Sequence, residues 1–172
     1  MATLSEGTSA GAEAVLKEIE DAFGMVPNLF RAYAAHPPLL KANWEKVKAV
    51  MMEGALSRKV KEAMAFLVSK DNSCDYCVTA HGAALRSIGV SEEEMKVIEE
   101  DPGSAPFDEK EKALIEFIRK ANLEPLAVSE TELDRVRAAG ATEADIVEAL
   151  GVMELFIAFN RFADTMKIEV DF

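Results

Sequence analysis

The hydrophobic periodicity of this chain is helical wherever it can be read, and this feature limits the possible folds more than any other. In residues 12–23, apolar side chains recur every three or four positions, and Gly24 follows as a helix stop. The same pattern predicts helices over residues 28–35, 38–53, 57–70 and 74–88. Only residues 167–172 alternate like a strand, and so short a segment does not form a sheet. The sequence therefore predicts an all-α fold.

Helix-capping residues mark three further helix starts. Ser91 and Ser129 each begin a capping box with a glutamate three residues later, and Thr142 begins a weaker version. Residues 146–163 are apolar almost all round, so we expect this helix in the centre of the core or in contact with another subunit. We expect one helical bundle domain over residues 1–172 that forms a homo-oligomer.

The composition of the chain indicates which classes of partner are unfavourable and which cell compartment to expect. The 172 residues carry a net charge of −12, which argues against nucleic acid or an anionic membrane surface as a partner. No apolar run approaches the ~18 residues of a membrane span. The first 15 residues lack the basic and apolar regions of a secretory signal. We therefore expect a cytoplasmic protein.

Both cysteines of the chain lie in one short segment, 72-NSCDYCVTAH-81, with the spacing C-x-x-C-x-x-x-H. Haem attachment is excluded because Val78, and not a histidine, follows the second cysteine. A closed zinc site would need His36 in addition to the three residues of the motif. A structural disulfide across so small a loop would add little stability. The spacing favours a redox pair over these alternatives.

Helical spacing places Cys74, Cys77 and His81 on one face of a helix that starts near Cys74. Cys74 would lie in the first turn, where free N–H groups and the helix dipole stabilise a thiolate, and Cys77 one turn deeper beside His81. Glu62 is as far before the turn at residues 71–73 as His81 is after it, so we expect the two to lie opposite each other. The carboxylate would then orient the imidazole or carry a proton. The alternative is that Glu62 is a solvated surface charge.

These residues form the pattern E-x11-C-x2-C-x3-H. It resembles the signature of the alkylhydroperoxidase D-like branch of the carboxymuconolactone decarboxylase superfamily, and residues 25–165 are also similar to its peroxidase-related members. The resemblance implies an all-helical fold, subunits assembled as trimers or hexamers, and thiol-dependent reduction of hydroperoxides. That chemistry requires no metal and no tightly bound organic cofactor.

The resemblance also implies a role for each residue of the pattern. Cys77 resembles the attacking cysteine, Cys74 its disulfide partner, and Glu62 and His81 the proton relay. An external dithiol, either a thioredoxin-like protein or a lipoyl group, would restore the pair by thiol–disulfide exchange. Tyr76 stands where the best-known members have a histidine, and it would donate a hydrogen bond or pack against a neighbour.

Three other functions remain open for the same residues. A general thiol–disulfide oxidoreductase would use the same cysteines on protein or small-thiol substrates. Decarboxylation of a lactone, the activity that names the superfamily, should not need both cysteines. A non-enzymatic redox switch would use the disulfide to change its assembly.

A weak internal repeat relates residues 56–100 to residues 107–151 at an offset of 51 positions. The identical pairs are Lys59/Lys110, Lys61/Lys112, Phe66/Phe117, Arg86/Arg137, Gly89/Gly140 and Glu92/Glu143. The constant offset favours duplication of a helical unit, although any two capped amphipathic helix pairs can align this well. The second copy lacks the chemistry, since Pro125, Val128 and Glu132 stand opposite the motif.

Three further features have a structural interpretation. Trp44 is expected in the core, and His36, which precedes two prolines, is expected to be a turn or packing residue. Arg161 and Asp164 are expected to form an ion pair, either buried or between subunits, or exposed.

Overall fold

The computed structural model describes residues 10–172, and this part of the chain is all-α, as predicted. Its helices are α1 Ala10–Phe23, α2 Asn28–Tyr33, α3 Pro37–Val47, α4 Arg58–Asp71, α5 Asp75–Ser87, α6 Glu92–Glu100, α7 Glu109–Leu123, α8 Glu130–Ala138 and α9 Glu143–Met166. Within this range there is no strand, and no helix has the length and apolar character needed to cross a membrane. Residues 1–9, which carry part of the prediction that no secretory signal is present, lie outside the described residues.

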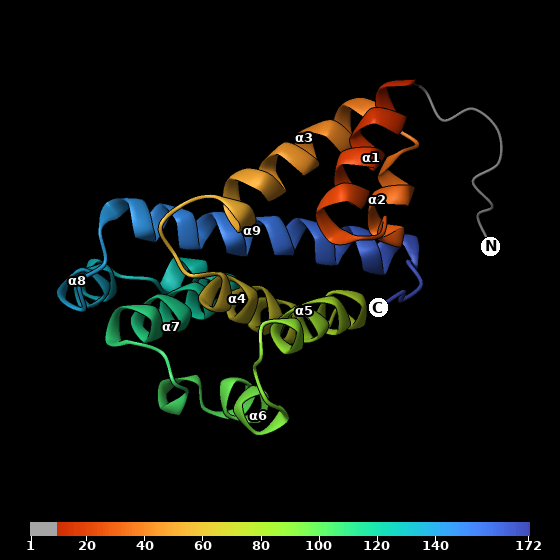
Figure 1. The fold of residues 1–172 in the computed structure, drawn as a ribbon. Coiled ribbons are helices and arrows are strands. Elements are labelled where there is room, and N and C mark those ends of the chain that lie inside the picture. Colours follow the sequence, from red (N-terminus) through yellow and green to blue (C-terminus); the bar gives the residue numbers. More distant parts are fainter. Residues whose placement is uncertain (1–9) are drawn as a thin grey trace.

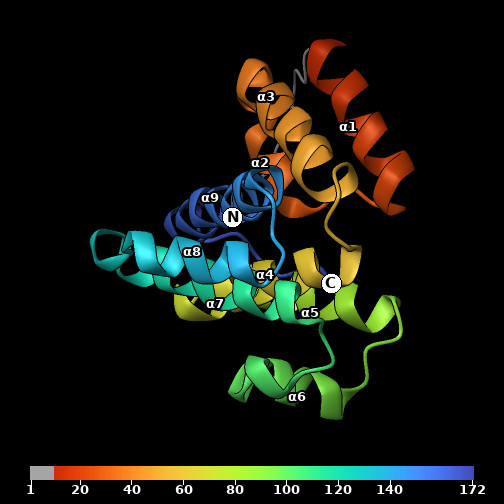
Figure 2. The ribbon, with the colours of Figure 1, turned by 90° about the vertical axis from the view of Figure 1, so that its left-hand side faces the viewer.

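Helix α9 occupies the centre of the molecule, between α1–α3 on one side and α4, α5 and α7 on the other (Figure 1). It begins earlier than its apolar stretch because Thr142 and Asp145 cap each other. The Thr142 N–H donates to Asp145 Oδ2 at 2.8 Å, and the Asp145 N–H donates to Thr142 Oγ1 at 3.1 Å. The predicted place of this helix in the core is confirmed by the buried side chains along it. Helices α4, α5 and α7 form a layer, and α6 lies on the side of this layer that faces away from α9 (Figure 2).

Helix α4 is buried on every side over residues 60–69, where the sequence predicted only one apolar face. The reason is long-range packing, since α5, α7 and α9 all contact this helix. Lys61 is accordingly buried with an ion partner: its Nζ is 2.5 Å from Oε1 of Glu148 on α9. Lys61 also donates to the backbone carbonyl of Glu53. This pair fixes the connection between α3 and α4 against α9.

The connection into α4 also differs from the prediction. The helix expected over residues 38–53 is α3 as far as Val47 and then a π-helical turn, Lys48–Met52. Residues 102–104 and 125–127 form short 3₁₀ turns that the periodicity did not reveal. Each begins at a proline, which cannot donate a helical hydrogen bond.

A tight turn between α4 and α5 sets the position of the cysteines. Ser73 has a left-handed φ of 59°, and its N–H donates to the Lys70 carbonyl at 2.9 Å. The N–H of Cys74 donates to the Ser69 carbonyl at 2.9 Å. These two hydrogen bonds are those of a Schellman motif. Cys74 is therefore the N-cap of α5, one residue before the first turn in which it was predicted.

Candidate active site

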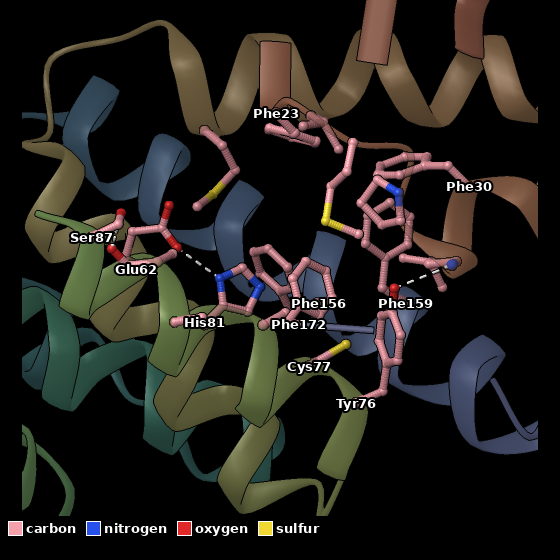
Figure 3. A pocket seen from close by; sticks show the side chains of 18 of the residues that line it. Phe23, Phe30, Glu62, Tyr76, Cys77, His81, Ser87, Phe156, Phe159 and Phe172 are labelled. Carbon is pink, nitrogen blue, oxygen red and sulfur yellow. Dashed lines mark hydrogen bonds and ion pairs between the residues drawn. The ribbon is translucent and has the colours of Figure 1, made fainter. Parts of the chain in front are cut away.

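An acid–imidazole pair bridges α4 and α5. Nδ1 of His81 is 2.7 Å from Oε2 of Glu62, as the spacing across the turn predicts (Figure 3). The two side chains are only 13% and 11% exposed, so the alternative of a solvated Glu62 is wrong. The His81 ring stands edge-on to Phe156, with ring centroids 4.3 Å apart. A carboxylate on Nδ1 fixes the orientation of the ring and leaves Nε2 directed into the space beside Cys77 (Figure 3).

The two cysteine thiols are reduced, buried and hydrogen-bonded to each other. This hydrogen bond, together with burial, raises the pKa of Cys77, and the same hydrogen bond lowers the pKa of Cys74. Of the two sulfurs, Cys74 therefore gives up its proton more readily than Cys77. The sequence predicted the depressed pKa of Cys74, but from the helix dipole and not from its partner thiol.

Asp164 on α9 is the charged neighbour of this pair. Its carboxylate hydrogen-bonds Cys74, and its charge raises the pKa of both thiols. Within residues 10–172 the carboxylate of Asp164 contacts Cys74 and forms no ion pair with Arg161, so the predicted pair within one chain is wrong. The alternative of a pair between subunits stays a prediction.

A cavity of about 340 Å³ lies beside Cys77 and the Glu62–His81 pair (Figure 3). Its walls are mainly apolar, and five of the residues that form them are phenylalanines: Phe23, Phe30, Phe156, Phe159 and Phe172. Cys77 borders this cavity and Cys74 does not. A ligand in the cavity would therefore meet the sulfur of Cys77 first. Mainly apolar walls with a few convergent polar groups are typical of a small-molecule site.

Tyr76 has a structural role beside this cavity. Its hydroxyl accepts a hydrogen bond from the Leu29 N–H at 3.2 Å and donates to Asp171 Oδ1 at 3.0 Å. The other oxygen of Asp171 accepts from the Asn28 N–H at 2.7 Å. Burial, with the nearby charge of Asp171, raises the pKa of Tyr76. Tyr76 thus joins α2, α5 and the C-terminal segment and does not replace a relay histidine.

The residues of this C-terminal segment were missed from the sequence. Residues 167–172 alternate like a strand, but they form an extended tail that packs over α5. The ring of Phe172 stands edge-on to Tyr76, with centroids 5.6 Å apart, and it completes one wall of the cavity. No local pattern could have indicated this contact, because the partners are separated by more than 90 positions in the chain.

Two other residues have the structural roles expected for them. Trp44 is buried, and its ring contacts Phe23 and Phe30 behind the cavity wall. Nδ1 of His36 accepts from the Leu39 N–H at 3.2 Å and caps α3. His36 is thus engaged at a helix start and is not joined to the cysteine motif.

Fold and site together define a helical protein with a buried dithiol beside an acid–imidazole pair. A model of the carboxymuconolactone decarboxylase family matches residues 37–120. The chain is similar to a crystal structure of a peroxidase-related protein from Silicibacter sp. TM1040, with 26% identity, a TM-score of 0.87 and coverage of 97% of this chain and 88% of the other. It is also similar to a peroxidase-related protein with an alkylhydroperoxidase AhpD core from Ralstonia eutropha JMP134, with 25% identity, a TM-score of 0.82 and coverage of 96% and 91%.

A curated relative is an alkyl hydroperoxide reductase from Mycobacterium tuberculosis, 29% identical over 92 residues. The matched region is 54% of this chain but only 26% of that protein, so the chain spans about a quarter of this relative. The family match and the two similar structures agree with the motif. The chain is thus similar to the carboxymuconolactone decarboxylase family over residues 37–120, and it has the fold of the peroxidase-related, alkylhydroperoxidase D-like proteins.

Proposed function

We propose that this protein is a thiol-dependent peroxidase that reduces hydroperoxides with Cys77 and Cys74. The observation that carries the proposal is the position of Cys77. Its sulfur lies on the wall of an apolar cavity, with the hydrogen-bonded Glu62–His81 pair on the same wall and Cys74 in contact behind it. Nucleophile, proton carrier and disulfide partner are thus grouped around one small space.

The first step is attack of the Cys77 sulfur on the terminal oxygen of a hydroperoxide. The O–O bond breaks, Cys77 becomes a sulfenic acid, and the proton of its thiol passes to His81, which Glu62 orients. The leaving alkoxide takes this proton from His81 and departs as an alcohol.

The second step closes the disulfide. The Cys74 thiol attacks the sulfenic sulfur of Cys77 and releases water. An external dithiol, a thioredoxin-like protein or a lipoyl group, then returns both sulfurs to thiols and is itself oxidised to a disulfide. We also propose that the chain acts as a homo-oligomer, a trimer or hexamer, which is consistent with exposed apolar side chains such as Val147.

Burial of the sulfurs favours this function over general thiol–disulfide exchange. Cys74 and Cys77 are 0% and 2% exposed. A small hydroperoxide fits the mainly apolar cavity of about 340 Å³ that reaches Cys77, so the site suits a small-molecule substrate. Lactone decarboxylation is less favoured because that reaction should not need both cysteines.

The test is stopped-flow mixing of the reduced protein with excess cumene hydroperoxide, followed by a count of free thiols. We expect the wild type to lose two thiols per chain, much faster than a free thiol reacts, and the Cys77→Ser variant to keep its remaining thiol. A wild-type rate no higher than that of a free thiol would contradict the peroxidase proposal.

A further inference from the structure

A buried polar pair lies behind the cysteines, where an apolar contact would be expected. Ser69 on α4 and Asn160 on α9 are both fully buried, and Ser69 Oγ is 3.1 Å from Asn160 Oδ1. Their surroundings are otherwise core residues of the same two helices. Buried polar side chains are costly unless they form hydrogen bonds, so such a pair in a core calls for a physical reason.

Ser69 contacts both cysteines. Its backbone carbonyl accepts from the Cys74 N–H at 2.9 Å, within the turn that joins α4 to α5. The contact of its hydroxyl with the side chain of Cys77 lowers the pKa of that thiol, against the raising effects of Cys74 and of burial. Ser69 is therefore placed to act on the reacting sulfur itself.

Asn160 is incompletely satisfied in its observed orientation. Its Nδ2 is buried and has no hydrogen-bond partner among residues 10–172. Rotation of the amide by half a turn would exchange Oδ1 and Nδ2, which are nearly isosteric, and Nδ2 would then donate to Ser69 Oγ. In the observed orientation the hydroxyl proton is held by Asn160. In the rotated one it is free to point at Cys77.

We propose that Ser69, oriented by Asn160, is a further catalytic group that donates a hydrogen bond to the Cys77 sulfur when that sulfur is negatively charged. While Cys77 is a thiol, Ser69 Oγ donates to Asn160 Oδ1. When the proton leaves Cys77, the amide rotates and the hydroxyl donates to the thiolate. The inference rests on the proposed function, because it is the peroxidase reaction that needs a nucleophilic Cys77.

Two charged or polar neighbours act in the opposite direction: Cys74 at the start of α5 and Asp164 on α9 both raise the pKa of Cys77. Two phenols, Tyr33 on α2 and Tyr76 on α5, also lie near Cys77, whose charge contributes to their raised pKa values. The Glu62–His81 pair lies one turn further along α5. Among these neighbours, Ser69 is the one that lowers the pKa of Cys77.

The test measures the nucleophilicity of Cys77 without peroxide. In a Cys74→Ser background, the rate of alkylation by iodoacetamide is followed from pH 6 to pH 10, so that only Cys77 reports. We expect Ser69→Ala to lower the rate at pH 7 about tenfold and to move the pH profile upward, because the thiolate loses a charge-assisted hydrogen bond. Ser69→Thr keeps a hydroxyl and should restore most of the rate. Asn160→Leu should lower it, since the hydroxyl loses its orienting partner.

Thr79→Ala is the matched control. It removes a hydroxyl from the same helix as Cys77, but one that donates to the Asp75 carbonyl on an exposed face, so the profile should not move. A purely structural role of Ser69 would change the unfolding temperature of Ser69→Ala and leave its pH profile on that of the parent, and that result overturns the inference. Because alkylation consumes no peroxide, such a result leaves the peroxidase proposal to its own test.

Discussion

Residues 56–100 and residues 107–151 form two similar helical units, and only the first contains the reactive groups. In each unit a long helix, α4 or α7, is followed by a shorter one, α5 or α8, and then by a third helix, which is the whole of α6 in the first unit and the start of α9 in the second. Several contacts recur at the offset of 51 positions: the ion pairs Lys59–Glu94 and Lys110–Asp145, the ion pairs Arg86–Glu92 and Arg137–Glu143, and the positive φ angles of Gly89 and Gly140. We infer that the units arose by duplication.

The units differ at the connection between their first two helices. In the first unit, the Schellman turn at Ser73 places Cys74 directly at the start of α5, within reach of α4. In the second unit, α7 ends at Leu123 and a 3₁₀ turn, Pro125–Ala127, precedes α8. Pro125 occupies the place of Cys74 and has no N–H for a Schellman hydrogen bond. The ion pairs are common to both units and stabilise their helices. The tight turn at Ser73 occurs in the first unit, where it brings Cys74 close to α4.

The largest expected effect is on the rate of reaction with peroxide, which should depend on the first unit and not on the second. Glu62→Gln removes the charge that orients His81, so we expect the rate of thiol loss with cumene hydroperoxide to fall by about 100-fold. Glu132→Gln is the matched change, at the position of the second unit that corresponds to His81. It should leave the rate within about twofold. Equal losses in the two variants would show that the effect of Glu62 is not specific to the site.

A second comparison uses two lysines at equivalent positions. Lys61→Met would leave Glu148 without its buried ion partner, and we expect a loss of about 3–5 kcal/mol in the free energy of unfolding. Lys112 pairs with Glu109, whose side chain is 86% exposed, so Lys112→Met should change stability by no more than ~0.5 kcal/mol. Urea unfolding of both variants measures the difference. Similar values would mean that burial of α4 contributes less than the structure indicates.

The turn itself provides a smaller effect. Ser73 adopts a left-handed φ where Gly89 and Gly140 stand at the corresponding turns after α5 and α8. Ser73→Gly relieves this conformation, and we expect stabilisation of about 0.5–1 kcal/mol after allowance for the greater freedom of glycine in the unfolded chain. Thermal unfolding is the measurement, with Gly140→Ser as the reverse change. Destabilisation by Ser73→Gly would show that the serine makes a contact that offsets its strain.

The smallest effect should be shared by both units. The pairs Arg86–Glu92 and Arg137–Glu143 are largely exposed, so each should contribute little to stability in a double-mutant cycle. Because the two pairs occupy corresponding positions, their coupling energies should agree within the error of such a cycle. A clear coupling in only one unit would contradict the structural equivalence of the pairs.

Local patterns in the sequence were sufficient for the all-α fold and for the meeting of Glu62 with His81. Helical spacing and a short turn fix that contact within 20 residues of chain. They were insufficient wherever distant segments decide the outcome. The burial of α4 on all sides, the approach of Asp164 to Cys74 and the contact of Asp171 with Tyr76 each depend on packing between helices far apart in sequence.

The most direct test of the account is a single turnover. The reduced protein is mixed with one equivalent of cumene hydroperoxide, quenched, and measured for cumyl alcohol and for the peptide that contains Cys74 and Cys77. The account predicts one alcohol per chain and an intrachain disulfide between these cysteines, with the reaction of Cys74→Ser stopping at a sulfenic acid on Cys77. Alcohol without a Cys74–Cys77 disulfide, or unreacted thiols with intact peroxide, would contradict it.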